Sequence, residues 1–304
     1  MIKSITVTNY LGDSIKLELG RPEQSGFLIK SISGLGPSKA NINTTEVSTN
    51  DGSLFNSARL NQRNIVFEFI FVESINRESI EDIRQKSYKY FPIKKNVDLL
   101  IETDNRIVKT TGYVESNEPN IFSSQEGAQI SIICPDPYFY STEKTVTIFS
   151  GIEPLFEFPF ENNSLTDNLL EFGEIIVNQE KTVFYKGDSE VGVVIHIHAI
   201  GEATNLTIYN ALTREVLKID TDRLEALTGS IIKAGDDIII STIKGQKFIR
   251  LIRDGEYINI LNCLGRNSDW FRLVKGDNVF VFTAETGERN LQFRIENSIV
   301  YEGV

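Results

Sequence analysis

Apolar residues in this chain occur mainly in short alternating or continuous runs of strand length. Alternation with a period of two places every second side chain on the same face, which is typical of a half-buried β-strand. In the first half, such runs cover Ile2 to Thr8, Ser14 to Leu19, Phe27 to Ile32, Ile65 to Phe71, Val97 to Glu102 and Gln129 to Cys134. The pattern therefore predicts that the first half of the protein is mostly β.

One segment of the first half, INRESIEDIRQKSYKYFP, has helical spacing instead. Ile80, Ile83 and Tyr90 recur at near-helical intervals, and Pro92 ends the segment. Asn76 is the expected N-cap, and the acidic residues after it suit the positive end of a helix dipole. We expect one helix here, lying on a sheet.

A long polar stretch, GLGPSKANINTTEVSTNDGSLFNSARLNQR, runs from Gly34 to Arg63. Asn50, Asp51 and Gly52 lie at its middle, and Asp-Gly is typical of a tight hairpin turn because glycine readily adopts positive φ. Loops of this length are uncommon in compact domains unless they have a function. We interpret the stretch as a protruding arm that packs on a neighbouring subunit, and the alternative is a mobile surface loop.

The segment CPDPYFYSTEK, which begins at Cys134, marks the expected domain boundary because its two prolines end a strand. A chain of 304 residues also favours two domains, which we place at residues 1–140 and 141–304. Many short strands with tight turns and no clear helix favour an antiparallel β-sandwich for the second domain, in which only DTDRLEALTG is expected to add a helical turn. Its strands are Gly192 to His198, Asn205 to Tyr209, Asp237 to Ile243, Lys247 to Arg253, Tyr257 to Leu261, Asn278 to Thr283 and Leu291 to Glu296.

The formal net charge of -11 argues against a protein that grips nucleic acid, which needs clustered Lys and Arg. Weak repulsion of phosphate suits a channel through which DNA passes, and solubility alone is the alternative explanation of the acidity. The N-terminal sequence has neither a signal-peptide pattern nor an apolar run that could span a bilayer. We therefore expect assembly in a cytoplasm, without membrane insertion.

Few residues are candidates for catalysis or metal binding. The only two histidines, His196 and His198, lie two apart on an expected strand and so share a face, but no third metal ligand is visible. Cys134 and Cys263 lie in strand-like flanks and are interpreted as core residues, not as a disulfide. No catalytic triad motif occurs, and no pair of carboxylates stands out as a catalytic pair. We expect neither an enzyme nor a cofactor.

Three aromatic residues suggest a different function, that of a carbohydrate-binding module. Tyr257, Trp270 and Phe271 are candidates for a platform on the second domain that stacks against host cell-wall sugars. The competing interpretation is that Trp270, the only tryptophan, anchors the core beside a tight turn. Both interpretations stay open at this point.

The order and spacing of many short segments resemble the distal tail proteins of siphophages that infect Gram-positive hosts. The resemblance spans nearly the whole chain, and its most specific part is the segment CPDPYF that begins at Cys134. In the first half it further rests on the Asp51-Gly52 arm, the strand ending at Phe71, the helix around Ile83, the Tyr-Phe-Pro after it and the Gly112-Tyr113-Val114-Glu115 strand. In the second half it rests on Gly187-Asp188, Val191-Gly192, Asn205, Asn210, Trp270, the segment from Leu273 to Asn278 and the final Tyr301-Glu302-Gly303-Val304.

The resemblance implies a β-barrel-like N-terminal domain with one α-helix, which forms a homohexameric ring, and a C-terminal galectin-like antiparallel β-sandwich. In this family the ring continues the tail tube on one side and meets the tail-associated hub protein on the other. Its periphery can hold receptor-binding proteins. We therefore expect a structural virion protein of the tail tip, and the carbohydrate-binding module remains the alternative. Some relatives carry inserted carbohydrate-binding modules, for which this chain is too short.

The polar arm is the expected site of contact between ring subunits. A durable contact in a closed ring of identical subunits buries about 1,000 Å² or more, and an arm can supply that area. We expect the subunit interface to include Asp51, Gly52, Phe55, Arg59 and Arg63.

Overall fold

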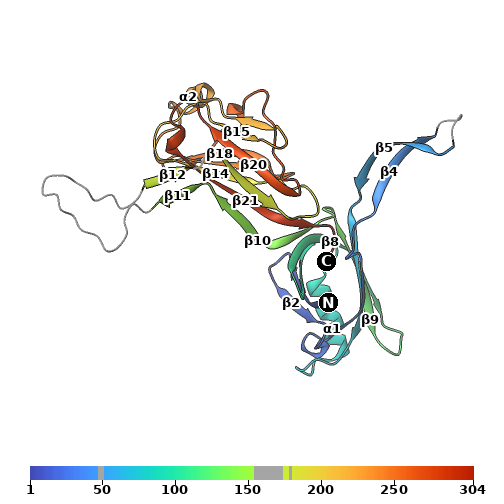
Figure 1. Cartoon of the computed structure of the whole chain (residues 1–304). Helices are drawn as coiled ribbons and strands as arrows, with labels where there is room; N and C mark the ends of the chain where they lie inside the picture. Colours follow the sequence, from blue (N-terminus) through green and yellow to red (C-terminus); the bar gives the residue numbers. More distant parts are fainter. Residues whose placement is uncertain (47–50, 154–173, 178–179) are drawn as a thin grey trace, which may run out of the picture. The chain divides into compact units, whose positions relative to one another are not determined.

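The computed structural model describes residues 1–46, 51–153, 174–177 and 180–304. The chain divides into two compact units: unit 1 is Met1–Glu143 with Val300–Val304, and unit 2 is Lys144–Ile299 (Figure 1). The chain leaves unit 1 within strand β10 (Phe139–Ile148) and returns within β21 (Leu291–Tyr301). The C-terminal residues therefore belong to unit 1, whereas the sequence boundary placed everything after residue 140 in the second domain.

Unit 1 is a curled antiparallel sheet with the strand order β2-β1-β7-β8-β9-β6-β3. The long strand β8 connects its two halves, since its first part pairs with β7 and its last part with β9. The strands are β1 (Ile2–Asn9), β2 (Ser14–Glu18), β3 (Phe27–Ser33), β6 (Arg63–Phe71), β7 (Asn96–Thr103), β8 (Ile107–Asn120) and β9 (Gly127–Cys134). Within the described residues the edge strands β2 and β3 do not pair with each other, so the barrel-like sheet is not closed.

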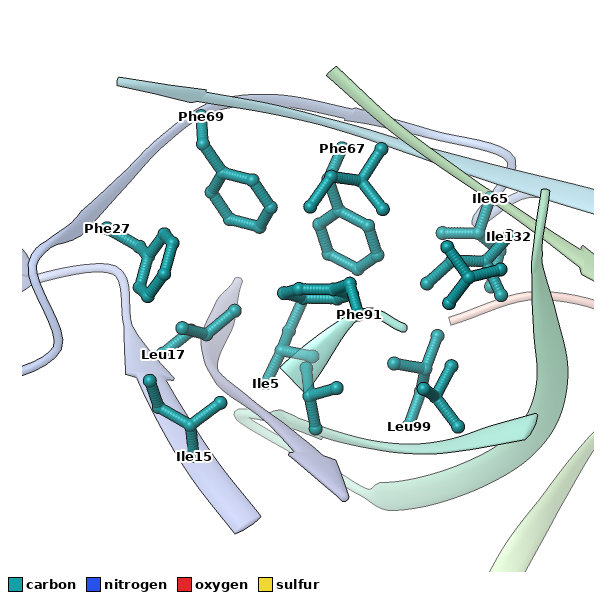
Figure 2. Packing of buried hydrophobic residues seen from close by; sticks show 14 of the residues in the cluster. Ile5, Ile15, Leu17, Phe27, Ile65, Phe67, Phe69, Phe91, Leu99 and Ile132 are labelled. Atoms are coloured by element: carbon teal, nitrogen blue, oxygen red, sulfur yellow. The ribbon is translucent and has the colours of Figure 1, made fainter. Parts of the chain in front are cut away.

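The core of unit 1 follows the alternation seen in the sequence. In β6, every second residue from Arg63 to Phe71 is buried, and the residues between them are partly or fully exposed. Figure 2 shows the resulting cluster, in which Phe91 lies among side chains from both halves of the sheet. Its ring centroid lies 6.2 Å from that of Phe67 and 5.8 Å from that of Phe69. Burial of each such side chain contributes about 1.5–3 kcal/mol.

The expected helix of unit 1 is present as α1 (Ile80–Tyr90), which packs on the core through Ile83. Its N-cap is Ser79, so the prediction of Asn76 is wrong. The Ser79 hydroxyl accepts a hydrogen bond from the Asp82 amide, and the Asp82 carboxylate accepts one from the Ser79 amide. This reciprocal capping box satisfies two amides that lack helical partners, and Arg77, at a φ of 59°, precludes an earlier start.

Unit 2 is the expected antiparallel sandwich. One sheet has the order β19-β18-β17-β14-β21, and the other has the order β13-β20-β15-β16. The two sheets meet through Phe282 of β20, whose ring centroid lies 3.8 Å from Phe293 of β21 and 4.6 Å from Phe149. The strands are β13 (Glu180–Tyr185), β14 (Val194–Ala199), β15 (Thr207–Asn210), β16 (Val216–Lys218), β17 (Asp237–Ser241), β18 (Phe248–Arg253), β19 (Glu256–Asn259) and β20 (Gly276–Thr283), with a separate hairpin of β11 (Ser150–Glu153) and β12 (Glu174–Val177).

The segment DTDRLEALTG forms a complete short helix, α2 (Thr221–Thr228), and so contributes more than the single turn expected. Asp220 caps its first turn by accepting a hydrogen bond from the Arg223 amide, and Gly229 ends it with a φ of 79°. Short 3-10 helices occur at η1 (Pro22–Gln24), η2 (Leu261–Cys263) and η3 (Glu288–Asn290). No helix in the described ranges is long and apolar enough to cross a membrane.

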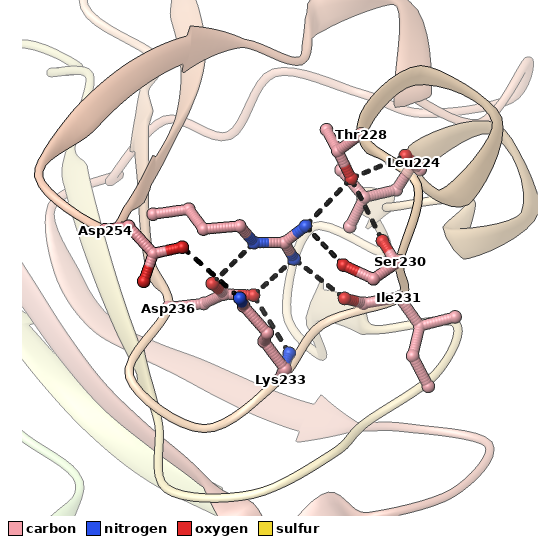
Figure 3. Close-up of polar contacts among 8 residues, drawn as sticks. Leu224, Thr228, Ser230, Ile231, Lys233, Asp236 and Asp254 are labelled. Atoms are coloured by element: carbon pink, nitrogen blue, oxygen red, sulfur yellow. Dashed lines mark hydrogen bonds and ion pairs between the residues drawn. The ribbon is translucent and has the colours of Figure 1, made fainter.

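A buried ion pair holds the chain that follows α2. The Arg253 guanidinium donates to the Asp236 carboxylate at 2.8 and 2.6 Å (Figure 3). Both side chains are almost fully buried. The remaining donors of Arg253 reach the hydroxyls of Thr228 and Ser230 and the carbonyl of Ile231. The hydrogen bond with Asp236 raises the pKa of Arg253, so the charged form of the guanidinium is favoured.

Candidate functional site

The predicted arm is present as a two-stranded sheet of β4 (Ala40–Glu46) and β5 (Ser53–Leu60). The pairing runs from Ala40 opposite Leu60 to Glu46 opposite Ser53, with one irregularity in register. Gly52 has the positive φ expected of it, 87°, and lies in the connection between Glu46 and Ser53, of which residues 47–50 are outside the described residues. The hairpin in this stretch is thereby confirmed.

The arm exposes large apolar side chains. Every residue of β4 and all of β5 except its last residue are exposed. Ile42, Leu54 and Phe55 are 60%, 62% and 66% exposed, so water covers most of their apolar surface. Burying such side chains is favourable by about 25 cal/mol per Å². An isolated two-stranded ribbon is itself only marginally stable in water. The arm therefore gains from contact with a partner surface.

Four of the five residues expected at the subunit interface lie on the exposed arm. Asp51 and Gly52 lie in the turn, and Phe55 and Arg59 lie on β5. Arg59 also lines a hollow of about 570 Å³ at the base of the arm, together with Leu60, Asn61, Gln62 and Pro135. The arm thus offers both a protruding ribbon and a recess beside its base.

Arg63, the fifth of these residues, lies inside unit 1 and is only 2% exposed. Its guanidinium donates to the carbonyls of Gly34, Gly36, Pro137 and Glu302, with distances of 2.6 to 2.8 Å for all but the bond to Gly36. The ring of Phe139 lies against the guanidinium, 4.2 Å from ring centroid to Cζ. Burial lowers the pKa of Arg63.

Arg63 therefore connects three parts of the chain that are far apart in sequence. Gly34 and Gly36 precede the arm, Pro137 follows the last strand of the sheet, and Glu302 belongs to the C-terminal segment. The side chain fixes the base of the arm to the body of unit 1. The sequence carries no signal of this role, because none of the acceptors is a side chain.

The three candidate sugar-stacking residues do not form one platform. Phe271 is fully buried and packs edge-on against Phe280, with ring centroids 5.7 Å apart. Trp270 is partly buried, and the Lys247 ammonium lies 5.2 Å from its ring centroid. Tyr257, 72% exposed, lies on β19 and does not line the cavity of about 380 Å³ beside Trp270. Phe271 thus contributes to the core of unit 2, and Trp270 lies at the edge of that core.

The two histidines share one face of β14, as the spacing predicted, and each faces a carboxylate. His198 Nδ1 lies 2.7 Å from Asp237, and His196 Nε2 lies 3.5 Å from Glu296. Burial lowers the pKa of His196. No group of three His, Cys, Asp or Glu side chains that could hold a metal ion occurs in the described ranges.

Both cysteines are free and buried, as expected of core residues. Burial raises the pKa of the Cys134 and Cys263 thiols, which disfavours the thiolate needed of a nucleophile.

Comparison with known proteins identifies likeness in structure but not in sequence. No family model matches the chain, and no curated protein sequence matches it. The structure is similar to that of the SPP1 Dit protein (gp 19.1), a hub of the adsorption apparatus of phages that infect Gram-positive bacteria. That match has a TM-score of 0.65 and 12% sequence identity, and covers 98% of this chain and 100% of the SPP1 chain.

A second similar structure is a chain of the phage P2 baseplate in its activated conformation with calcium. That match has a TM-score of 0.51 at 12% identity and covers 98% of each chain. Because both matches extend over nearly the full length of both chains, they include the two units and the arm region together. At this identity they establish the fold, and the resemblance seen in the sequence is confirmed at that level: the chain has the fold of a phage Dit-like baseplate hub protein.

Proposed function

We propose that this protein is a structural subunit of a phage baseplate, a distal tail hub that joins the tail tube to the tail-tip apparatus. The observation that carries the proposal is the full-length structural similarity to the SPP1 Dit protein. The exposed apolar arm adds support, because a subunit of an assembly needs apolar surface that it can bury against its neighbours. In this proposal the protein has no catalytic activity and acts through its contacts in the virion tail tip.

The proposed assembly is a homohexameric ring. Its subunits contact one another through the arm, with Phe55 and Arg59 at the interface and Asp51 and Gly52 at the turn. Ile42, Leu54 and Phe55 supply apolar surface, and the hollow beside Arg59 is a recess that a neighbouring subunit can fill. In a closed ring, the same heterologous contact is repeated between all neighbouring subunits, so the arm of every subunit contacts the next subunit.

The proposed partners follow from the position of such a ring in a tail. One side contacts the tail tube protein, the other contacts the tail-associated hub protein, and the periphery can hold a receptor-binding protein. The net charge of -11 suits a channel that DNA passes without binding. The protein would assemble in the host cytoplasm before the virion is released.

The experiment that tests this proposal is the mass of the purified protein by light scattering, followed by negative-stain images at the same concentration. Six-fold rings with a central channel are the expected result. A monomer that also fails to form rings when mixed with the tail tube and tail-associated hub proteins would contradict the proposal.

A further inference from the structure

The outer face of one sheet of unit 2 carries two rows of mainly polar side chains. Strand register sets Arg250, Ile239, His196 and Arg294 side by side across β18, β17, β14 and β21. The adjacent row, set by the same pairings, contains Ile252, Asp237, His198 and Gln292. Neighbouring strands are about 4.8 Å apart, so each row spans about 14 Å.

These rows line a cavity of about 460 Å³. Its polar residues are His196, His198, Asp237, Gln292 and Arg294, and its apolar wall includes Ile148, Ile239 and Ile252. The volume lies within the range of about 300 to 1,000 Å³ that is usual for small-molecule sites. The cavity belongs to unit 2 alone, so its shape does not depend on unit 1.

Two charged side chains line this cavity, Arg294 and Asp237, and each lies close to a polar partner; Arg250, in the first row, does not line the cavity. Arg294 lies 3.1 Å from Glu296, whose carboxylate is also 3.2 Å from the Lys144 ammonium. Asp237 lies 2.7 Å from His198. With one guanidinium and one carboxylate, the cavity lining therefore offers many hydrogen-bond donors and acceptors but little net charge.

This balance of positive and negative groups limits the classes of ligand that the cavity can bind. A phosphate-rich ligand would require an excess of cations. A wholly apolar ligand would remove water from the exposed sides of the Asp237 and Arg294 side chains, which are 49% and 46% exposed, and would offer them no hydrogen bond in return. The core of a protein interface is normally depleted of charged residues, which are abundant here.

A sugar ring meets these conditions. Each hydroxyl both donates and accepts, and so can bond to the imidazole, amide, carboxylate and guanidinium groups of the face. The C–H faces of the ring can pack against Ile239 and Ile252. We propose that this face of unit 2 is a binding site for a neutral saccharide, with His196, His198, Asp237, Gln292 and Arg294 as its polar contacts.

Tyr257 extends the site at one end. Strand register places it beside Ile252, and its ring is 72% exposed. An exposed tyrosine ring at this position provides a stacking surface for a second sugar unit. The site thus retains one member of the aromatic set considered from the sequence, but it is distinct from the cavity beside Trp270. It is also independent of the proposed hub function.

The test is binding of the full-length protein to an array of neutral and anionic oligosaccharides, with calorimetric titration of each hit. His198→Ala and Arg294→Ala change side chains that are 47% and 46% exposed, so the fold should persist, which thermal melting checks. Arg272→Ala is the matched control, since Arg272 is 55% exposed and pairs with Glu190 outside the site. Trp270→Ala tests the other cavity.

We expect at least one neutral oligosaccharide to bind, with its affinity lowered about tenfold or more by either site variant. The Arg272→Ala and Trp270→Ala variants should bind like the wild type. Gln292→Glu provides a second site variant, because an added carboxylate removes the amide donor without changing the side-chain size, and it should also weaken binding. Absence of binding to any neutral oligosaccharide at millimolar concentration overturns the proposal. Loss of binding only in Trp270→Ala, or binding confined to anionic sugars, also overturns it.

Discussion

At the residue scale, Arg63 and Arg59 are the same type of residue but have different roles in the fold. They lie four positions apart, yet Arg59 is exposed on the arm and Arg63 is buried with its guanidinium bonded to four carbonyls. Buried arginine is tolerated only when its donors are satisfied, because an unpaired charge or polar group in the interior is costly. The two residues form a natural matched pair for mutation.

We predict that Arg63→Met destabilises unit 1 by about 3 kcal/mol or more, since the carbonyls of Gly34, Pro137 and Glu302 lose their donor. Arg59→Met should change stability by no more than about 0.5 kcal/mol. Urea unfolding followed by fluorescence measures both. Equal midpoints for the two variants would show that the Arg63 bonds contribute nothing to stability.

A prediction of the same kind concerns the buried Arg253–Asp236 pair of unit 2 (Figure 3). Arg253→Met leaves a buried carboxylate without its partner and should cost about 3–5 kcal/mol. The double variant Arg253→Met with Asp236→Leu removes both charges and should be more stable than Arg253→Met alone. Thermal and urea unfolding of the two variants test this order, and the reverse order would contradict it.

His196 gives unit 2 a specific dependence on pH. Burial holds its pKa below the ordinary value of 6.5, so the unfolded chain binds the proton more tightly than the folded one. The group therefore favours the folded state above about pH 6.5, and that contribution is lost as the pH falls through the lower folded-state pKa. The groups facing it are Glu296, Arg294, Lys144 and Asp237.

We predict that the free energy of unfolding falls between pH 7.5 and pH 5.5, and that His196→Gln makes this slope shallower. Urea unfolding at closely spaced pH values measures the slope in both proteins. An identical slope in the variant would show that His196 does not contribute.

At the scale of elements, the arm is a separable piece of structure. The Asn61 amide donates to the Lys39 carbonyl at 3.0 Å, so the two ends of the ribbon meet at its base. We predict that replacing residues 40–60 with a short Gly-Asn turn leaves the melting temperature of the subunit nearly unchanged but abolishes rings. Light scattering and negative-stain images of the deletion variant check this, with the double variant Leu54→Ser, Phe55→Ser as a milder change. Intact rings from the deletion variant would rule out the arm as the subunit contact.

At the scale of the whole molecule, unit 1 is built from both ends of the chain. Tyr301 and Val304 pack against its core, the Glu302 carbonyl accepts from Arg63, and the Arg106 guanidinium lies 4.7 Å from the Tyr301 ring centroid. Unit 2 is inserted into unit 1 between Glu143, within β10, and Val300, within β21, and its sandwich has its own core. The C-terminal residues are therefore a structural part of the first unit.

We predict that residues 1–143 alone are less stable, by about 2–3 kcal/mol, than the same residues joined through a flexible linker to residues 300–304. Residues 144–299 should fold without either segment. Calorimetric melting of the three proteins measures this. Equal melting temperatures for the two forms of unit 1 would mean that the returning segment is dispensable.

Features that depend on near neighbours in the chain follow from the sequence alone. Alternation along β6 specified a strand with one buried face, helical spacing around Ile83 specified α1, and Asp51-Gly52 indicated the hairpin of the arm. The cap at Ser79 was also readable, because Asp82 follows it at the spacing of a capping box. These features follow from the chemistry of a few consecutive residues, which the chain carries wherever it folds.

Contacts between distant groups depend on the fold as a whole. It placed Arg63 among carbonyls from both ends of unit 1, buried Phe271 while leaving Tyr257 exposed, and set His198 beside Gln292 across two strands. Among the residues that the structure describes, it also left the curled sheet of unit 1 open. Strand order and register fix such contacts, and they result from the packing of whole faces. No local pattern of residues encodes them, because a partner can lie more than a hundred positions away.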